Sequence, residues 1–295
     1  MTAVAKLRDM LEKPGFIACP GVYDGISTRA ALQSSPQCLY ATGAGMTASV
    51  LGLPDLAYAT LDNFVQQAGM IASCDRSVPV IADAETGFGA STQVARTVER
   101  YIQAGIAGLH IEDQVQTKRC GHLQGKILVP AEEFAARIRA AVIGRQRSGG
   151  DIVIIARTDA MQSFGVDESI VRLKAAIEAG ADVAFFEAAR TKEDVVKVVE
   201  ALKPTPVLLN ILQGGVTPDF TVPEMEAMGV KIGIYPTTGL MVALQASLQA
   251  YNHLKETGTY VHADMTIREF FAVVGLEDSI AIDKAAGGTT YSNGI

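Results

Sequence analysis

Three segments of the sequence repeat one pattern, in which a helical stretch ends in glycine and a short apolar run follows at once. The glycines are Gly105, Gly180 and Gly229. A glycine just past the end of a helix adopts the left-handed conformation that stops it. A continuous apolar run is typical of a strand buried on both faces of a parallel sheet. The pattern therefore predicts helix–strand units repeated around one parallel sheet.

Strand patterns of this kind occur about eight times along the chain. They begin near Phe16, Cys38, Val78, Gly108, Ile152, Val183, Val207 and Lys231. Helical patterns lie between them, near 25–34, 61–75, 92–104, 131–146, 167–179, 192–203 and 222–228. This spacing predicts an α/β fold, a closed (β/α)₈ TIM barrel, in preference to an open doubly wound sheet. We expect a catalytic barrel over residues 1–240 and a C-terminal helical extension of the same domain over 241–295.

Composition and charge exclude several classes of protein. Of the 295 residues, 48% are hydrophobic and 19% charged, which allows a large core and argues against disorder. The net charge of −7, without a basic cluster, argues against nucleic acid or a membrane surface as the main partner. Residues 1–15 carry scattered charges unlike a secretory signal, and apolar runs fall short of a membrane span. We expect a cytoplasmic protein, with an organelle left open.

Carboxylates end two neighbouring predicted strands, at the end of the barrel where such folds carry out chemistry. Asp83 and Glu85 follow the third strand, and Glu112 ends the fourth. Three like charges brought together need a cation or protons. Oxygen ligands without a histidine cluster favour Mg²⁺ or Mn²⁺ over zinc. We predict a metal site here; the alternative is that one or two of the three cap helices or pair with basic residues on the rim.

Three further features predict how a small anion is held and transformed. Arg157 emerges from an apolar strand, where its guanidinium suits a substrate carboxylate; an ion pair with Glu187 or Asp159 is the alternative. The glycine-rich turn at 42–45 lets backbone N–H groups approach an anion. Cys120 lies among basic residues that favour its thiolate, which suggests an acid, base or nucleophile on a loop. An incidental exposed cysteine is the alternative.

The run Lys-Arg-Cys-Gly-His at 118–122 and the stretches at 51–55, 83–89, 109–114 and 156–159 together resemble the isocitrate lyase/phosphoenolpyruvate mutase superfamily. The resemblance covers about residues 15–240, and the first run is a marker of its carbon–carbon lyases. It implies Mg²⁺, with Mn²⁺ as a substitute, and no organic cofactor. It also implies a small 2-hydroxy or 2-oxo dicarboxylate as ligand, and a homotetramer whose subunits exchange a C-terminal helix. The helices after 239 fit that exchange.

The resemblance also implies a role for individual residues. The implied metal ligands are Asp83, Glu85 and Glu112. The implied catalytic residues are Cys120, as general acid on a gating loop, Arg157, Tyr23 and Glu187. The implied substrate-binding residues are Thr42, Gly43, Ala44, Asp55, Gly121, His122, Arg157, Asn210 and Pro236. Glu85 stands where the family usually has aspartate, so contact through water stays open. The base stays open among Tyr23, Glu187 and a metal-linked carboxylate.

The residues after the 118–122 run distinguish subgroups of the superfamily. Members that cleave 2-methylisocitrate often continue with Arg-Pro-Asn-Lys, whereas this chain has Leu-Gln-Gly-Lys at 123–126. Pro236 stands where members that hydrolyse oxaloacetate carry serine. We therefore expect a carbon–carbon lyase that cleaves C2–C3 of a 2-alkylmalate, first of all 2,3-dimethylmalate to pyruvate and propionate. Cleavage of 2-methylisocitrate and hydrolysis of oxaloacetate stay open as alternatives, and a non-enzymatic binding barrel is the least favoured.

Overall fold

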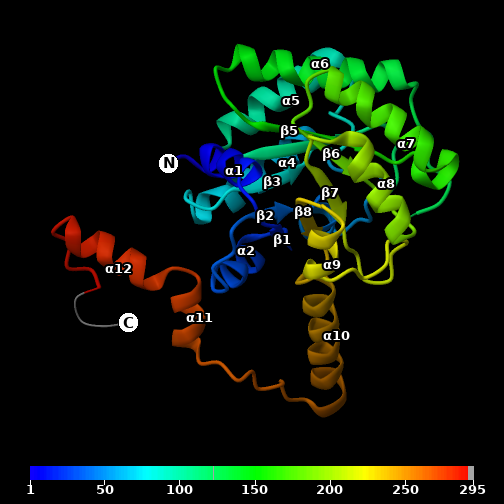
Figure 1. Ribbon diagram of the computed structural model, residues 1–295. Coiled ribbons are helices and arrows are strands. Elements are labelled where there is room, and N and C mark those ends of the chain that lie inside the picture. The colour runs from blue at the N-terminus through cyan, green and yellow to red at the C-terminus, as the bar shows by residue number, and fades with distance from the viewer. Residues whose placement is uncertain (122, 292–295) are drawn as a thin grey trace.

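Eight parallel strands close into a barrel in the computed structural model, which describes residues 1–121 and 123–291 (Figure 1). Each strand pairs with the next, and β8 pairs with β1 through Ile17 opposite Ile232. The strands are β1 Ile17–Val22, β2 Leu39–Ala41, β3 Val80–Asp83, β4 Gly108–Glu112, β5 Val153–Thr158, β6 Val183–Phe186, β7 Val207–Asn210 and β8 Ile232–Tyr235. The predicted (β/α)₈ barrel is confirmed.

Helices surround the barrel and continue beyond it. They are α1 Ala3–Glu12, α2 Gly25–Leu32, α3 Gly43–Leu51, α4 Leu61–Cys74, α5 Ser91–Gln103, α6 Ala131–Arg147, α7 Met161–Glu178, α8 Lys192–Leu202, α9 Val222–Ala227, α10 Leu240–Thr257, α11 Ile267–Val273 and α12 Leu276–Ala285. The helical stretches predicted before residue 230 all form. Two helices, α1 and α3, were not predicted.

The unpredicted helix α3 occupies the segment expected to be a glycine-rich turn. Thr42 caps it, with its hydroxyl accepting from the backbone N–H of Gly45 at 3.5 Å. Glycine disfavours a helix because it loses the most backbone freedom on folding. The helix forms nonetheless, since neighbouring side chains pack directly on its two glycines. The expectation of a turn at 42–45 is therefore corrected to a helix N-terminus.

The amino end of the barrel is filled by apolar side chains. Leu7 of α1 is fully buried there, and it packs in one cluster with Ile17, Val153 and Val183, the first residues of β1, β5 and β6. Two larger clusters fill the space between the sheet and the surrounding helices. This closed, packed end leaves the carboxyl ends of the strands as the open end of the barrel, which is where polar side chains gather.

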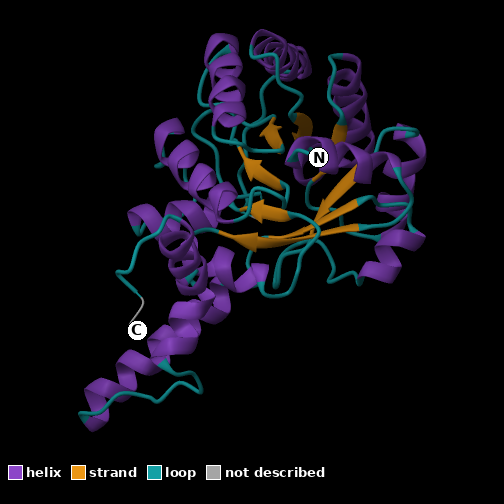
Figure 2. Cartoon of the chain, turned by 90° about the vertical axis from the view of Figure 1, so that its left-hand side faces the viewer, coloured by secondary structure: helices purple, strands orange, loops and turns teal. Residues whose placement is uncertain are grey.

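The last three helices extend away from the barrel. Figures 1 and 2 show them projecting from one side of the barrel, and in Figure 1 α10 lies below α9, α11 lies below α2, and α12 lies to the left of α2. Among the described residues of these helices none is buried, although large apolar side chains such as Val242, Leu244, Tyr251 and Ile267 lie on them. An exchange of helices between subunits is not visible in a single chain. No helix in the described part of the chain is long and apolar enough to cross a bilayer.

Candidate active site

Two neighbouring strands carry the predicted metal ligands to one edge of the barrel. Asp83 ends β3 and Glu112 ends β4, and both are buried. Glu85 lies in the turn after β3 with a φ of +53°, a left-handed conformation that costs a residue with a side chain about 1–2 kcal/mol. Its backbone N–H donates to Asp83 Oδ1 at 2.8 Å. The strained turn thus holds two carboxylates next to the third.

Asp83, Glu85 and Glu112 form what is called here the acidic edge of the barrel. The N-terminus of α3 lies against this edge, next to Asp83. A side chain at Gly43 would strike the carboxylate of Asp83, and a Cβ at Gly45 would lie 2.7 Å from the Cβ of Tyr23. Both positions therefore require glycine, because the side chains of Asp83 and Tyr23 come too close for a Cβ. Because unpaired backbone N–H groups point out of a helix N-terminus, the segment beginning at Thr42 can bind an anion beside Asp83 and Tyr23.

Glu112 is fully buried beside Arg157. Its Oε1 accepts from the side-chain amide of Gln114 at 3.0 Å, and its Oε2 lies 3.3 Å from Nη1 of Arg157. Burial raises the pKa of Glu112 well above its usual range, while the charge of Arg157 lowers it. The carboxylate therefore depends on nearby positive charge to stay ionised.

Arg157 is the centre of a group of buried charges at the end of β5. Its guanidinium donates to Asp159 at 3.0 and 3.2 Å, and it lies 3.8 Å from Glu187 and 5.2 Å from the ring centre of Phe185. Asn210, at the end of β7, donates to both oxygens of Glu187 at 3.3 and 3.4 Å. The ion pairs weighed as an alternative for Arg157 thus exist, and they hold its guanidinium in position.

Lys118 is a buried residue that sequence reasoning named only as part of the 118–122 run. Its ammonium lies 2.5 Å from Asp55 and 2.7 Å from Glu85. It therefore ties the segment after α3 to the turn after β3, across the acidic edge. The sequence feature that could have identified Lys118 is its position two residues before Cys120, in a segment too polar for the core.

The loop after β4 folds over Arg157. A Cβ at Gly121 would collide with the guanidinium of Arg157 and would lie 3.0 Å from Cδ of Glu187. Cys120, next to Gly121, is partly exposed. His122 was predicted to bind substrate, and it lies outside the described residues. On the other side of the barrel Pro236 follows β8 and packs directly on the backbone position of Gly21.

The oxygen atoms of these residues decide whether a divalent cation suits the site. Within residues 1–121 and 123–291, no three acidic, histidine or cysteine side chains converge closely enough to hold an ion together. Oε2 of Glu85 lies 2.7 Å from the ammonium of Lys118, and Oε2 of Glu112 lies 3.3 Å from Nη1 of Arg157. Lys118 is also paired with Asp55, and Arg157 with Asp159 and Glu187, so these two cations are shared among more carboxylates than they can neutralise. Together with Asp83, Glu85 and Glu112 form an all-oxygen donor set of the kind that Mg²⁺ prefers.

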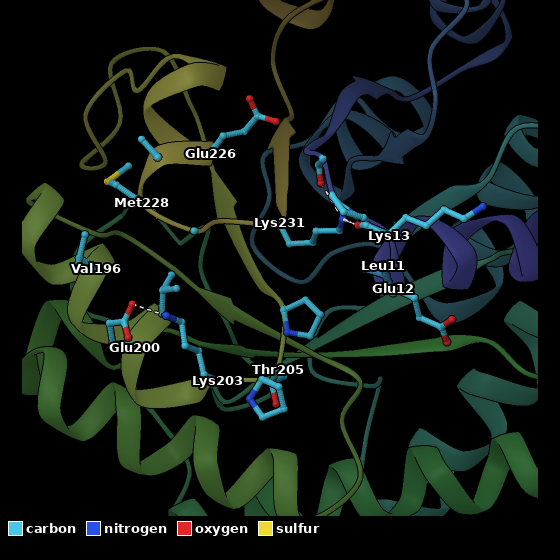
Figure 3. A pocket seen from close by; sticks show the side chains of 17 residues that line it. Leu11, Glu12, Lys13, Val196, Glu200, Lys203, Thr205, Glu226, Met228 and Lys231 are labelled. Carbon is cyan, nitrogen blue, oxygen red and sulfur yellow. Dashed lines mark hydrogen bonds and ion pairs between the residues drawn. The ribbon is translucent and has the colours of Figure 1, made fainter.

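A separate cavity of about 640 Å³ lies at the opposite end of the barrel (Figure 3). Its lining includes Lys13, Lys203 and Lys231, which precede β1, β7 and β8. The ammonium of Lys231 donates to the backbone carbonyls of Lys13 and Gly15, and Lys203 pairs with Glu200 at 2.6 Å. These lysines are engaged in structural contacts, at the end of the barrel that serves stability rather than catalysis.

An arginine-centred acidic site at the carboxyl ends of a closed (β/α)₈ barrel defines a TIM-barrel enzyme. The chain belongs to the phosphoenolpyruvate phosphomutase family, whose model matches residues 7–255, and so to the isocitrate lyase/phosphoenolpyruvate mutase superfamily. The resemblance stated from the sequence is thereby confirmed.

Two relatives lie within the lyases of this superfamily. The 2,3-dimethylmalate lyase of Eubacterium barkeri is 38% identical over 94% of this chain and 96% of its own length. The 2-methylisocitrate lyase of Bacillus subtilis is 34% identical over 96% of this chain and 93% of its own. Both are carbon–carbon lyases, and the prediction of an enzyme of this class is confirmed.

Solved structures resemble the chain over nearly its whole length. A crystal structure of 2,3-dimethylmalate lyase has a TM-score of 0.97 and 47% identity, covering 100% of this chain and 99% of that one. Oxaloacetate acetylhydrolase with 3,3-difluorooxalacetate has a TM-score of 0.96 and 47% identity, covering 98% of each chain. Phosphonopyruvate hydrolase in complex with oxalate and Mg⁺⁺ has a TM-score of 0.85 and 25% identity, covering 96% and 99%.

Proposed function

We propose that this protein is a Mg²⁺-dependent lyase that cleaves the C2–C3 bond of 2,3-dimethylmalate to pyruvate and propionate. The observation that carries the proposal is the buried guanidinium of Arg157 between the acidic edge and the loop that bears Cys120. A 2-alkylmalate has a carboxylate for the guanidinium, a hydroxyl next to it, and a carbon that must be protonated after cleavage. The site offers one group for each.

The metal site of this proposal consists of Asp83, Glu85 and Glu112. Mg²⁺ bound there would offset their charge and polarise the C2 oxygen of the substrate. The protein itself supplies part of the positive charge that these carboxylates need. Lys118 lies 2.7 Å from Glu85, and Arg157 lies 3.3 Å from Glu112. Asp55, held by Lys118 at 2.5 Å, completes the acidic edge.

Binding and proton transfer fall to residues around Arg157. Arg157 holds the C1 carboxylate, and the N–H groups of Gly43 and Ala44 hold the other carboxylate at the start of α3. Burial and the nearby Asp24 raise the pKa of Tyr23, so it stays protonated and donates a hydrogen bond. Glu187 then takes the C2 hydroxyl proton as the C2–C3 bond breaks. The carbonyl of pyruvate forms at C2, and the electron pair passes to the propionate enediolate.

Cys120 completes the reaction by donating its thiol proton to C3 of the enediolate. Replacement by serine keeps the size but supplies a far weaker acid, so Cys120→Ser lowers kcat by about 10²-fold or more. Glu187→Gln, which cannot accept the hydroxyl proton, has a comparable effect. Steady-state rates and circular dichroism of both variants test this. Near-normal turnover by Cys120→Ser would remove the thiol from the mechanism.

The substrate is tested by product analysis of the purified protein with Mg²⁺. We offer 2,3-dimethylmalate, 2-methylisocitrate and oxaloacetate side by side and expect pyruvate and propionate from the first. Pyruvate and succinate from 2-methylisocitrate in preference would favour the second candidate, which the lyase from Bacillus subtilis suggests. Oxalate and acetate would favour hydrolysis. Pro236→Ser should raise oxaloacetate hydrolysis if that position selects the reaction, and no change would end that argument.

Metal removal tests the acidic edge. Chelation by EDTA should abolish lyase activity, and added Mg²⁺ or Mn²⁺ should restore it. Asp83→Ala should stay inactive at saturating Mg²⁺, because it removes one ligand of the proposed set. Calorimetric titration with Mg²⁺ gives a readout besides activity: the wild-type chain should bind one ion and Asp83→Ala should bind it far more weakly. Full activity in EDTA would refute the metal role.

We further propose a homotetramer in which α10–α12 pack on neighbouring copies. These helices carry the exposed apolar side chains Val242, Leu244 and Tyr251 and have no buried residue in the described chain. Exposed apolar side chains that gather on one element are typical of a protein–protein interface. Sedimentation velocity should give a tetramer, and truncation after 239 should lower the assembly state. A monomer at micromolar concentration would contradict the proposal.

A further inference from the structure

Lys126 carries an ammonium group that is fully buried beside the candidate site. Its side chain has no exposed surface, and it follows the loop that bears Cys120. The ammonium donates to the backbone carbonyl of Gly121 at 2.5 Å and to Oδ1 of Asp159 at 2.8 Å. Burying a lysine charge is costly unless it is paired and hydrogen-bonded. Here one partner belongs to the barrel and the other to the tip of the loop.

The barrel partner, Asp159, is rigidly held. Its backbone N–H donates to Oδ1 of Asp113 at 2.9 Å, and Asp113 is itself paired with Arg172 at 3.2 Å. Its carboxylate binds Arg157 through two nitrogens at 3.0 and 3.2 Å. Although burial opposes it, the charges of Arg157 and Lys126 hold the pKa of Asp159 well below its usual range. Asp159 is thus a fixed anion shared by two cations.

The loop is anchored at both ends and held at its tip by Lys126. At one end the side chain of Gln114 bonds both backbone groups of Arg119, at 2.8 and 3.2 Å. At the other end, backbone bonds join Ile127 to Val115 and Val129 to Asp113, each at 2.9 Å. Between these anchors, the hydrogen bond from Lys126 holds Gly121, the residue after Cys120, in close contact with Arg157 and Glu187.

We propose that Lys126 is a positioning residue that latches the loop after β4 in its closed form, and so sets where the Cys120 thiol stands over the substrate. The role in turnover rests on the proposed lyase function. The latch itself does not, because it consists of contacts among the chain's own residues. Without the ammonium, the carbonyl of Gly121 would be buried without its donor, and the loop would open to let water bond it.

The first test measures closure without any substrate. Lys126→Met keeps the length of the side chain and removes its charge and donors. Iodoacetamide labelling of the four cysteines, followed by mass spectrometry, should show Cys120 reacting about tenfold faster or more, since a charge-assisted bond is worth about that factor in an equilibrium. Cys74, which is partly exposed, serves as the internal reference, and the buried Cys19 and Cys38 report general unfolding.

The matched control is Lys197→Met, which removes an exposed lysine paired with Asp167 at 2.6 Å and should leave all four labelling rates unchanged. Lys126→Arg keeps both charge and donors and should recover most of the protection of Cys120. Should Lys126→Met not fold, Lys126→Gln, which keeps one donor, is measured instead. Unchanged labelling of Cys120, or an equal rise at all four cysteines, would overturn the latch.

The second test measures turnover of 2,3-dimethylmalate with Mg²⁺. Lys126→Met should lower kcat by about tenfold or more with a smaller change in KM, because fewer complexes reach the closed form. Lys126→Arg should recover part of kcat. Normal kcat in Lys126→Met would overturn the positioning role. If the wild-type protein fails to cleave 2,3-dimethylmalate, the proposed function fails, while the labelling experiment still decides the latch.

Discussion

The buried guanidinium of Arg157 is the charge on which the rest of the candidate site depends. It lies within 4 Å of carboxylates from three strand ends, Glu112, Asp159 and Glu187. Each of these groups would be too costly to bury alone as an anion. Together they form a network in which the arginine is positioned and its positive charge offsets part of the cost of burying the carboxylates. A planar guanidinium suits this arrangement because it has five donors in fixed directions.

A second buried cation, Lys118, pairs with carboxylates at the acidic edge in the same way. It joins Asp55 to Glu85 across two loops, beside a turn whose left-handed Glu85 is strained. Strain of this kind persists only where surrounding contacts enforce it, and it gathers at functional sites. Lys118 faces Oε2 of Glu85 and Arg157 faces Oε2 of Glu112, but each of these cations is shared with other carboxylates. The chain has therefore placed more negative charge there than its own described residues neutralise, which is the condition for a bound cation.

Sequence reasoning succeeded where a residue's position along a strand decides its place in space. Asp83, Glu112 and Asn210 end their strands and Arg157 is the last residue but one of β5, and in a closed parallel barrel all strand ends meet at one rim. It failed at α3, where helix propensity argues against glycine but the close approach of Asp83 and Tyr23 requires it. It also gave no separate role to Gln114, Lys118 or Lys126, because their roles arise from contacts across loops.

The sequence by itself determined the repeating helix–strand order, the barrel, the family and the residues at the strand ends. These follow from local patterns: apolar runs, glycines after helices, and short motifs. Only the tertiary structure decided which charges pair. Lys126 meets Asp159 across 33 positions of the chain, and Lys118 meets Asp55 across 63. No local pattern encodes such contacts, because ion-pair partners are chosen by the distances that remain after the barrel has closed and its interior has lost water.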